Sequence, residues 1–293
     1  MLTLFTVPKP FEGHIGVIQR NAIQSWRRLH ADLEIFLFSD EKGISEMAVE
    51  CGAEHISRIK CNEYGTPMLD SIFEAAIRLA GNRILCYVNA DIILMNDFAK
   101  AVSRVMSMDS FLMVGRRWDM DIREPLNFSD PRWEEELRAQ VKARGKLHQA
   151  YGIDYFTFNR DLLGDAMPPF AVGRPTWDNW FIYNARRTKV PVIDATPAVT
   201  AVHQNHHYNP VLMARDESGE WKGPEVSVNR ELAGKRASTY NVNDATLVLY
   251  GESLIKQKKR VKARRFLTIS FPGVANKVVR LLRNAGLYEG VEE

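Results

Sequence analysis

The chain has little cysteine, and this limits the kinds of site that have to be considered. Three cysteines occur in 293 residues, Cys51, Cys61 and Cys86, and their spacing matches no pair of metal-binding cysteines. Small secreted proteins that rely on disulfides are much richer in cysteine. We therefore expect a protein of a reducing, cytoplasmic compartment.

Long apolar runs are also missing. No stretch reaches the roughly 20 apolar residues that span a bilayer. The first residues, MLTLFTVPKP, show no basic segment followed by a signal-type apolar core. With 45% hydrophobic and 26% charged residues, the composition is that of a globular protein with room for one large or two small domains.

Two widespread active-site motifs are absent. The chain has no Gly-x-x-x-x-Gly-Lys-Ser/Thr phosphate loop and no Gly-x-Ser-x-Gly nucleophile elbow. The sequence therefore excludes a P-loop nucleotide hydrolase and an esterase of the α/β-hydrolase type.

Excess positive charge is confined to the C-terminal tail. Residues 253–284 contain ten Lys or Arg and no acid, whereas 29 basic and 33 acidic residues give residues 1–252 a net charge of −4. An acidic body without a nucleic-acid reading motif is expected to bind no nucleic acid. From Pro272 the tail alternates apolar and basic residues at helical spacing, which predicts an interfacial helix on an anionic membrane surface. The alternative is a helix docked on the acidic body.

The first half of the chain alternates β-prone and amphipathic segments. Strands are expected at 2–7, 33–38, 55–59, 84–95 and 111–114, and helices at 15–29, 67–80 and 96–107. This rhythm predicts an α/β fold, a doubly wound and mostly parallel sheet with helices on both faces. The helix at 67–80 is expected to begin with Thr66 as its N-cap and Pro67 as its first residue.

The second half is less regular. Helices are expected at 132–144 and 179–187, and strands at 153–158, 190–193 and 198–203. We predict a catalytic domain over 1–208, a loop-rich extension or lid over 209–252, and the basic tail over 253–293. In the extension, Glu225 and Asn229 would share one face of a helix.

The segment 84–95 is apolar except for Asn89-Ala90-Asp91. It is expected to form one strand buried on both faces. A carboxylate there has lost much of its water and needs a cation, a metal ion or several hydrogen bonds. The alternative is that Asp91 caps a turn or the helix that starts near Asn96.

Three of the seven histidines, His203, His206 and His207, follow the apolar segment 198–202. Neutral imidazole is a common metal ligand, and Asp with His suits Mn, Zn or a similar metal better than Ca. His203, which is nearest to the strand, is the best candidate to meet Asp91. The alternative is a polar surface turn.

Further candidates lie between these two segments. Asp178 stands between two tryptophans in Trp177-Asp178-Asn179-Trp180, where water-excluding walls would raise its pKa toward that of a general base. It could instead cap the following helix. Asp154 begins a strand and could face the same cleft, and Arg116-Arg117 could present cations to phosphate or lie on the surface.

Taken together, these motifs resemble those of the GT-A fold glycosyltransferases, of a bacterial surface-glycan type, over roughly residues 1–205. Members of that family use nucleotide-diphosphate sugars, and an Asp-x-Asp at the end of a central strand binds the donor and a divalent metal. Here the triplet is Asn89-Ala90-Asp91, so an amide replaces the first carboxylate. The resemblance implies a site for Mn²⁺ or Mg²⁺ formed by Asp91 and His203.

The resemblance also implies roles for the other candidates. Donor-binding residues would be Thr6, Val7, Pro8, Asn89, Asp91 and Arg116. Acceptor-binding residues would be Asp154, Trp177 and Asn179, and Asp178 would be the base if the enzyme inverts. The implied reaction moves a sugar to an acceptor hydroxyl, on a glycan or lipid-linked acceptor, in a cytoplasmic protein attached peripherally to the inner face of the membrane.

Two other functions remain open from the sequence. The amide at Asn89 favours a catalytically inactive carbohydrate-binding or assembly protein. A sugar-nucleotide pyrophosphorylase would share the sheet, but it would need a glycine-rich basic loop after the first strand, and residues 6–13 have too few glycines for that.

Overall fold

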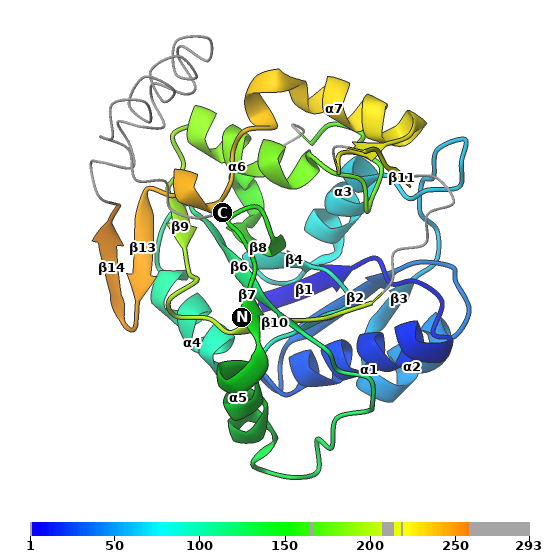
Figure 1. Ribbon diagram of the computed structural model, residues 1–293, viewed down its shortest axis with the longest axis vertical. Helices are drawn as coiled ribbons and strands as arrows, with labels where there is room; N and C mark the ends of the chain where they lie inside the picture. The colour runs from blue at the N-terminus through cyan, green and yellow to red at the C-terminus, as the bar shows by residue number, and fades with distance from the viewer. Residues whose placement is uncertain (1, 164–166, 207–213, 218, 258–293) are drawn as a thin grey trace. The chain divides into compact units, whose positions relative to one another are not determined.

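The computed structural model describes residues 2–163, 167–206, 214–217 and 219–257. A large mixed sheet runs through this part of the chain (Figure 1). Its main strands are β1 (Leu2–Thr6), β2 (Glu34–Phe38), β3 (Glu54–Ile56), β4 (Ile84–Val88), β6 (Leu112–Met120), β8 (Ile153–Asn159), β9 (Val192–Asp194), β13 (Leu247–Tyr250) and β14 (Ser253–Lys256). Across the sheet they follow the order β14-β13-β9-β6-β8-β4-β1-β2-β3.

Most neighbouring strands are parallel, which confirms the predicted fold class. β1 pairs in parallel with β2 and β4, and β9 pairs in parallel with β6 and β13. β8 is one exception, because it runs antiparallel to both β4 and β6. The shorter strands are β5 (Ile92–Ile93), β7 (Lys146–Leu147), β10 (Ala201–Gln204), β11 (Ala214–Arg215) and β12 (Trp221–Lys222).

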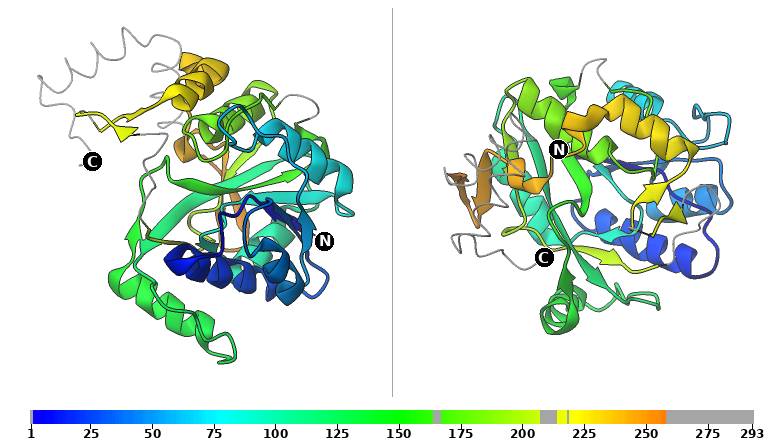
Figure 2. Two further views of the ribbon diagram at one scale, coloured as in Figure 1. Left: turned by 90° about the vertical axis from the view of Figure 1, so that its right-hand side faces the viewer. Right: turned by 45° about the horizontal axis from the view of Figure 1, so that its top comes forward.

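Helices cover both faces of the sheet, as predicted (Figure 1). α1 (Gly13–Arg27), α2 (Ile44–Cys51) and α4 (Asn96–Val105) share one hydrophobic cluster with the strands. α3 (Leu69–Leu79) and α6 (Trp177–Arg187) pack on the other face, and α7 (Pro224–Ala237) lies beside α6 (Figure 2). The remaining helices are α5 (Trp133–Arg144), η1 (Arg160–Leu162) and η3 (Val242–Asp244).

The two faces of the sheet are packed with different side chains, because successive strand residues point to opposite sides. The side under α1, α2 and α4 is mainly aliphatic. On the other side, Phe5 and Tyr87 of the strands meet Phe73 of α3 with ring centroids 5.0 and 5.6 Å away. Phe156 stacks on Phe181 of α6 at 5.5 Å. The alternation of side chains along each strand therefore provides the residues that fill the core on both faces of the sheet.

The expected single strand over 84–95 is wrong. β4 ends at Val88, and Asn89-Ala90-Asp91 form a turn in which the Ile92 N–H donates to the Asn89 carbonyl oxygen at 3.1 Å. β5 then leaves the main sheet and pairs with β10. Both strands are buried, so the apolar run continues although the backbone turns.

Three other expectations need correction. α3 begins at Leu69 with Met68 as its N-cap, because Pro67 and Met68 are held in bridges to Cys61 and Ala171. The part of 209–252 that is described contains helix α7, so it is not loop-rich throughout. β13 and β14 extend the sheet well past the expected boundary at residue 208.

Part of the predicted tail lies outside the described residues, as does His207. Among the residues that the structure describes, no helix is long and apolar enough to cross a membrane.

Candidate active site

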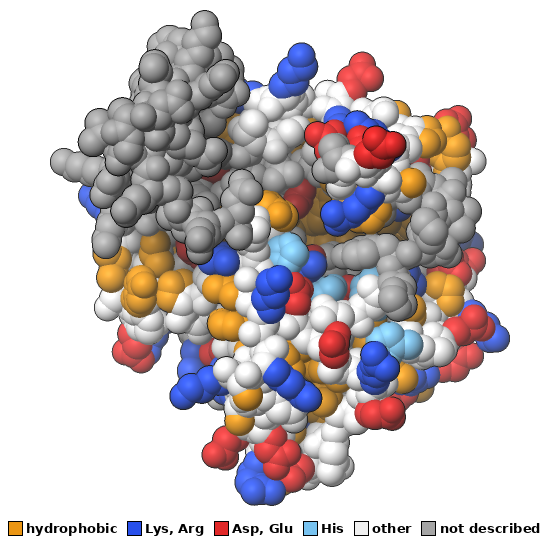
Figure 3. Space-filling model, viewed as in Figure 1, with side chains coloured by type: hydrophobic (Ala, Val, Ile, Leu, Met, Phe, Trp, Pro, Cys, Tyr) orange, Lys and Arg blue, Asp and Glu red, His pale blue; other side chains and the backbone are white. Residues whose placement is uncertain are grey.

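A cleft of about 750 Å³ opens along the edge of the sheet where β1, β2, β3 and β4 end. In open α/β sheets this carboxyl edge is the usual ligand site. Residues lining the cleft include Val7, Pro8, Ser39, Asp40, Ser57, Ile59, Asn89, Ala90, Asp91, Arg117, Asp154, Arg174 and His206. In the space-filling view, histidine side chains gather around the hollow in the middle of the face shown (Figure 3).

Asp91 meets two histidines at this cleft. Its Oδ2 lies 2.9 Å from His206 Nε2 and 3.6 Å from His203 Nε2. One ligand atom from each of the three residues lies within 4.8 Å of the others, a spacing at which they could hold a metal ion. The pairing of Asp91 with His203 is the one expected from the sequence, whereas His206 was ranked lower.

The donor atoms of this cluster fit a bound cation. Asp91 Oδ1 is buried and accepts no hydrogen bond from the described residues. Both ring nitrogens of His203 are also buried without a well-aligned hydrogen bond, although Nδ1 lies 3.1 Å from Asp119 Oδ1. An unpartnered buried carboxylate oxygen is costly unless a cation or a donor occupies the space beside it. Carboxylate oxygen and imidazole nitrogen are suitable ligands for Mn²⁺ and similar first-row metals.

Charge at the cluster is balanced within the protein. Burial raises the pKa of Asp91, but His203, His206 and Arg117 outweigh this effect and hold the pKa at about 2. Burial lowers the pKa of His203, and the carboxylates of Asp91 and Asp119 raise it by more. The aspartate is therefore ionised at neutral pH and available as a ligand.

The backbone around Asp91 is fixed by buried side chains. Gln204 donates through Nε2 to the carbonyl oxygens of Ile18 and Asp91, at 2.7 and 3.1 Å. Trp26 Nε1 donates to the Ile92 carbonyl oxygen at 2.8 Å. These contacts join α1 and β10 to the turn, so the carboxylate is held by rigid elements.

The amide at Asn89 has a local explanation. Asn89 Nδ2 donates to Asp154 Oδ1 at 2.6 Å, and Arg117 Nη1 donates to Asp154 Oδ2 at 2.8 Å. A carboxylate at position 89 would face the Asp154 carboxylate without a proton between them. Asn89 therefore suits its neighbour, and its amide does not by itself indicate an inactive protein.

Only some of the predicted donor-binding residues line the cleft. Val7 and Pro8 line the cleft, while Thr6 is fully buried at the end of β1. Arg116 donates through Nε to the His148 carbonyl oxygen at 2.6 Å. Arg117, rather than Arg116, is the arginine of this pair that lines the cleft.

Asp178 lies in the first turn of α6 and is not its N-cap, which is Thr176. Its Oδ1 atom is buried and has no hydrogen-bond partner among the described residues, although the residue as a whole is partly exposed. Burial raises the pKa of the carboxyl to about 6, against backbone hydrogen bonds that lower it, and the charge of Asp154 raises it further. A pKa close to neutral suits a general base.

The predicted acceptor residues have partners within the protein. Trp177 is buried between Tyr87 and Phe156, with ring centroids 5.1 and 4.8 Å away. Asn179 Nδ2 donates to the Tyr240 carbonyl oxygen at 2.5 Å. Asp154 lines the cleft, whereas Trp177 and Asn179 are not among its lining residues, and the contact of all three with an acceptor stays a prediction.

Helix α7 is attached to the rim of the cleft. Its Glu225 is buried and accepts from Arg174 at 2.6 Å and from Asn62 at 2.6 Å. Asn229, on the same face as expected, accepts from the Ala171 N–H and donates to the Ala171 carbonyl oxygen. Whether this region closes over a donor as a lid stays a prediction.

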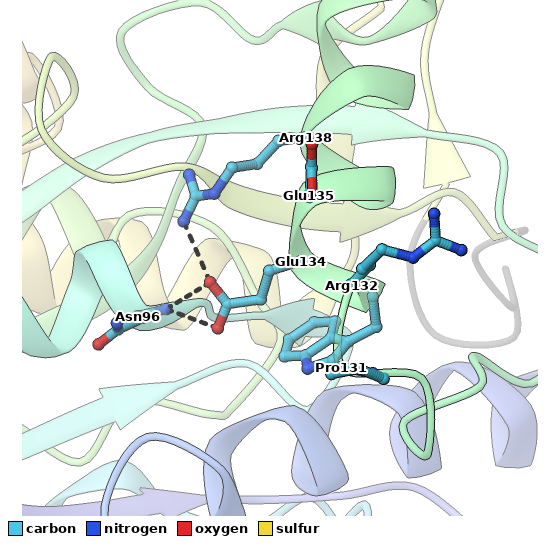
Figure 4. Close-up of a pocket in the computed structure, with 7 residues that line it drawn as sticks. Asn96, Pro131, Arg132, Glu134, Glu135 and Arg138 are labelled. Carbon is cyan, nitrogen blue, oxygen red and sulfur yellow. Dashed lines mark hydrogen bonds and ion pairs between the residues drawn. The ribbon is translucent and has the colours of Figure 1, made fainter.

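A second pocket, of about 450 Å³, lies at the start of α5 (Figure 4). There Glu134 accepts from the N–H of Asn96, the first residue of α4, and pairs with Arg138. These contacts explain the polar side chains as a helix cap and an ion pair. None of the predicted site residues lines this pocket.

Two known structures with a similar course of the chain contain a uridine nucleotide. S. aureus TarS 1-349 in complex with UDP-GlcNAc is 13% identical with a TM-score of 0.48, and the match covers 71% of this chain and 60% of that one. M. tuberculosis glucosyl-3-phosphoglycerate synthase, in complex with Mn²⁺, UDP and phosphoglyceric acid, is 14% identical with a TM-score of 0.42, covering 71% and 72%.

No protein-family model matches the chain, and no curated protein matches its sequence. This chain spans only about three fifths of the TarS fragment, and the identities are low. Its activity and ligands must therefore be argued from its own residues.

Proposed function

We propose that the protein is a metal-dependent glycosyltransferase that moves a sugar from a nucleotide-diphosphate sugar to an acceptor hydroxyl. The observation that carries this proposal is the cluster of Asp91, His203 and His206, with its unpartnered buried oxygen, at the carboxyl edge of the sheet. The cleft beside it is large enough for a nucleotide sugar, since ligand pockets typically measure about 300–1,000 Å³.

Asp91, His203 and His206 would hold Mn²⁺ or Mg²⁺ in this site. The ion would act as a Lewis acid that neutralises the charge developing on the diphosphate as it leaves. Val7 and Pro8, two of the predicted donor-binding residues, line the cleft. Arg117 also lines it but is paired with Asp119 and Asp154, so the metal ion would supply the positive charge for the diphosphate.

Asp178 is the proposed general base for an inverting transfer. Its carboxylate would accept the proton of the acceptor hydroxyl while that oxygen attacks the anomeric carbon. Asp178 is not among the residues that line the cleft, but Asp154, which does line it, is near enough for its charge to raise the pKa of Asp178. We assign the acceptor, a glycan or lipid-linked glycan of surface-polysaccharide synthesis, from the motif resemblance alone.

The test is a thermal-shift panel of UDP, GDP, CMP and dTDP sugars with and without Mn²⁺, followed by product analysis with the stabilising donor. A donor at a hundredfold excess over its Kd raises the stability of the native state by about 2.7 kcal/mol. We expect one nucleotide class to stabilise the protein only with metal, and sugar transfer or slow donor hydrolysis to follow. Donor binding without any turnover would favour the inactive carbohydrate-binding protein.

We further propose that the tail attaches the protein to the inner face of the cytoplasmic membrane. Support comes from the sequence, because most of the tail lies outside the described residues. Each basic residue at an anionic surface contributes roughly 1 kcal/mol. β14 ends at Lys256, so a truncation after Gln257 preserves the sheet.

In co-sedimentation with anionic vesicles at low salt, the full chain should bind and the truncated chain should not. Equal sedimentation of both would refute the role of the tail.

A further inference from the structure

One carboxylate near the metal cluster lies between two histidines. Asp119 Oδ1 is 3.1 Å from His203 Nδ1, and Asp119 Oδ2 is 2.7 Å from His148 Nδ1. The metal cluster itself uses the opposite ring nitrogen of His203, Nε2, which faces Asp91. Asp119 is therefore placed behind the proposed metal ligand, on the side away from the ion.

The sheet determines this contact. β10 runs parallel to β6, and His203 is the register partner of Asp119. Paired residues on neighbouring strands present their side chains on the same face, about 5 Å apart. The meeting of Asp119 with His203 thus follows from strand pairing and does not depend on a loop.

Asp119 is itself held in one orientation. Arg117, two residues earlier on the same face of β6, donates through Nε to Asp119 Oδ1 at 2.9 Å. Its other oxygen, Oδ2, faces His148 Nδ1 at 2.7 Å. The carboxylate is therefore held in place from both sides as a hydrogen-bond acceptor.

The loop after β7 leaves room for the second histidine. His148 N–H donates to the Arg117 carbonyl oxygen at 2.9 Å. A Cβ atom on Gly152 would lie 2.1 Å from Cδ2 of His148, so any larger residue at 152 would displace the ring. The absence of a side chain at Gly152 allows His148 to reach Asp119.

We propose that Asp119 is a positioning residue for the metal site: it accepts the Nδ1 proton of His203 and so leaves the Nε2 lone pair facing Asp91 and a divalent cation. The opposite tautomer would place a proton on Nε2, where the ion has to bind. Partners of this kind are common behind metal-ligating histidines. The inference rests on the metal site of the proposed function.

The test is a Mn²⁺ titration of the full chain, followed by the electron paramagnetic resonance signal of the free ion. Asp119→Ala removes the acceptor, and Asp119→Asn keeps an acceptor oxygen but loses the charge. Loss of such a partner typically weakens metal binding about 10–100-fold, so we expect the alanine variant near the upper limit and the asparagine variant near the lower. Asp121→Ala is the matched control, because this exposed carboxylate contacts Asn205 and not His203.

A purely structural role for Asp119 predicts a different pattern. Both variants would then lose folding stability, but the protein that remains folded would bind Mn²⁺ as the wild type does, and this result would overturn the inference while the metal site stands. Absence of Mn²⁺ binding in the wild type would instead count against the metal site itself, and with it the inference.

Nitrogen-15 NMR of labelled histidine gives a readout that needs no metal. At a pH where the ring is neutral, His203 should show the Nδ1-protonated tautomer in the wild type and a mixture in Asp119→Ala. An unchanged tautomer in Asp119→Ala would show that Asp119 does not position the ring.

Discussion

The predicted metal-binding residues and the predicted acceptor-binding residues differ in how their polar side chains are paired. In the metal-binding group, Asp91 Oδ1 and His203 Nε2 are buried and have no hydrogen-bond partner in the described part of the protein. In the acceptor-binding group, Asp154 and Asn179 form hydrogen bonds to Arg117, Asn89 and the Tyr240 backbone. The first group lacks partners that a ligand would supply, whereas the second is mostly paired within the protein.

This difference distinguishes residues that we expect to contact a ligand from residues that stabilise the fold. A buried polar atom without a partner costs roughly 1–3 kcal/mol, so beside a cleft it favours a ligand. Such atoms also occur in Asp70 and Asp97, which do not line the cleft, so the criterion has weight only together with a predicted role. Asp178 is the exception in the acceptor-binding group, because its Oδ1 atom is also buried without a partner in the described residues.

The largest expected effect separates Asp91 from Asp154. Asp91→Asn removes a charged ligand and should weaken Mn²⁺ binding by more than about 100-fold, since loss of a partner behind a ligand already costs 10–100-fold. Asp154→Asn should leave Mn²⁺ affinity nearly unchanged, but it breaks a buried pair with Arg117 and should lower the free energy of unfolding by about 3 kcal/mol.

Isothermal titration with Mn²⁺ and urea unfolding of both variants provide the two measurements. If Asp154→Asn loses Mn²⁺ binding as completely as Asp91→Asn does, the contrast between the metal-binding and the acceptor-binding residues is wrong.

The sheet and its helices were predictable because periodicity is a local signal. The strand 33–38 and the helix 96–107 were expected within two residues of β2 and α4. The turn at Asn89-Ala90-Asp91 was not, since β5 is buried by its pairing with β10, more than 100 residues away in the chain. An apolar run in the sequence predicts that the segment is buried, but it does not show which strand it will pair with.

The candidate site was predictable in its ligand types and less so in its partners. Asp91 follows a buried strand and His203 lies in one, so the two could be paired from sequence. The contact of Asp119 with His203 depends on strand register, and His206 lies in the segment after β10. A signal for Asp119 was present, because Arg117 and Asp119 are two residues apart after an apolar strand and so share a face. The sequence does not show that Asp119 meets His203, because this contact depends on the pairing of β10 with β6.

The next largest effect is on turnover at Asp178. Asp178→Asn should lower kcat by about 10²-fold or more, as expected for loss of a general base, while donor affinity changes little. Asp194→Asn is a matched control, because burial also raises the pKa of Asp194, but this carboxylate accepts a hydrogen bond from the Thr196 N–H and has no predicted role in the reaction. If the kcat of Asp178→Asn stays within a few-fold of the wild-type value, Asp178 is not the general base.

The smallest effect is the contribution of Asp178 to the pH dependence of stability. Its pKa is about 6 in the folded protein and 3.8 in the unfolded chain, so the folded state binds the proton more tightly. The contribution is therefore fully present below pH 3.8 and is lost as the pH rises through 6. Two pKa units correspond to about 3 kcal/mol, and partial exposure of the residue reduces this to roughly 2.

The measurement is the free energy of unfolding of wild type minus that of Asp178→Asn, by urea at several values between pH 4 and 7.5. The difference removes the titration of all other groups that the substitution leaves unchanged. We expect it to fall by roughly 2 kcal/mol across this range, with its midpoint below pH 6. In the same range the kcat of the wild type should rise with pH, because only the ionised carboxylate can accept the acceptor's proton. If the stability difference does not change with pH, water or a backbone donor satisfies Asp178 Oδ1. Asp178 would then count among the residues that stabilise the fold, and not among those that contact a ligand.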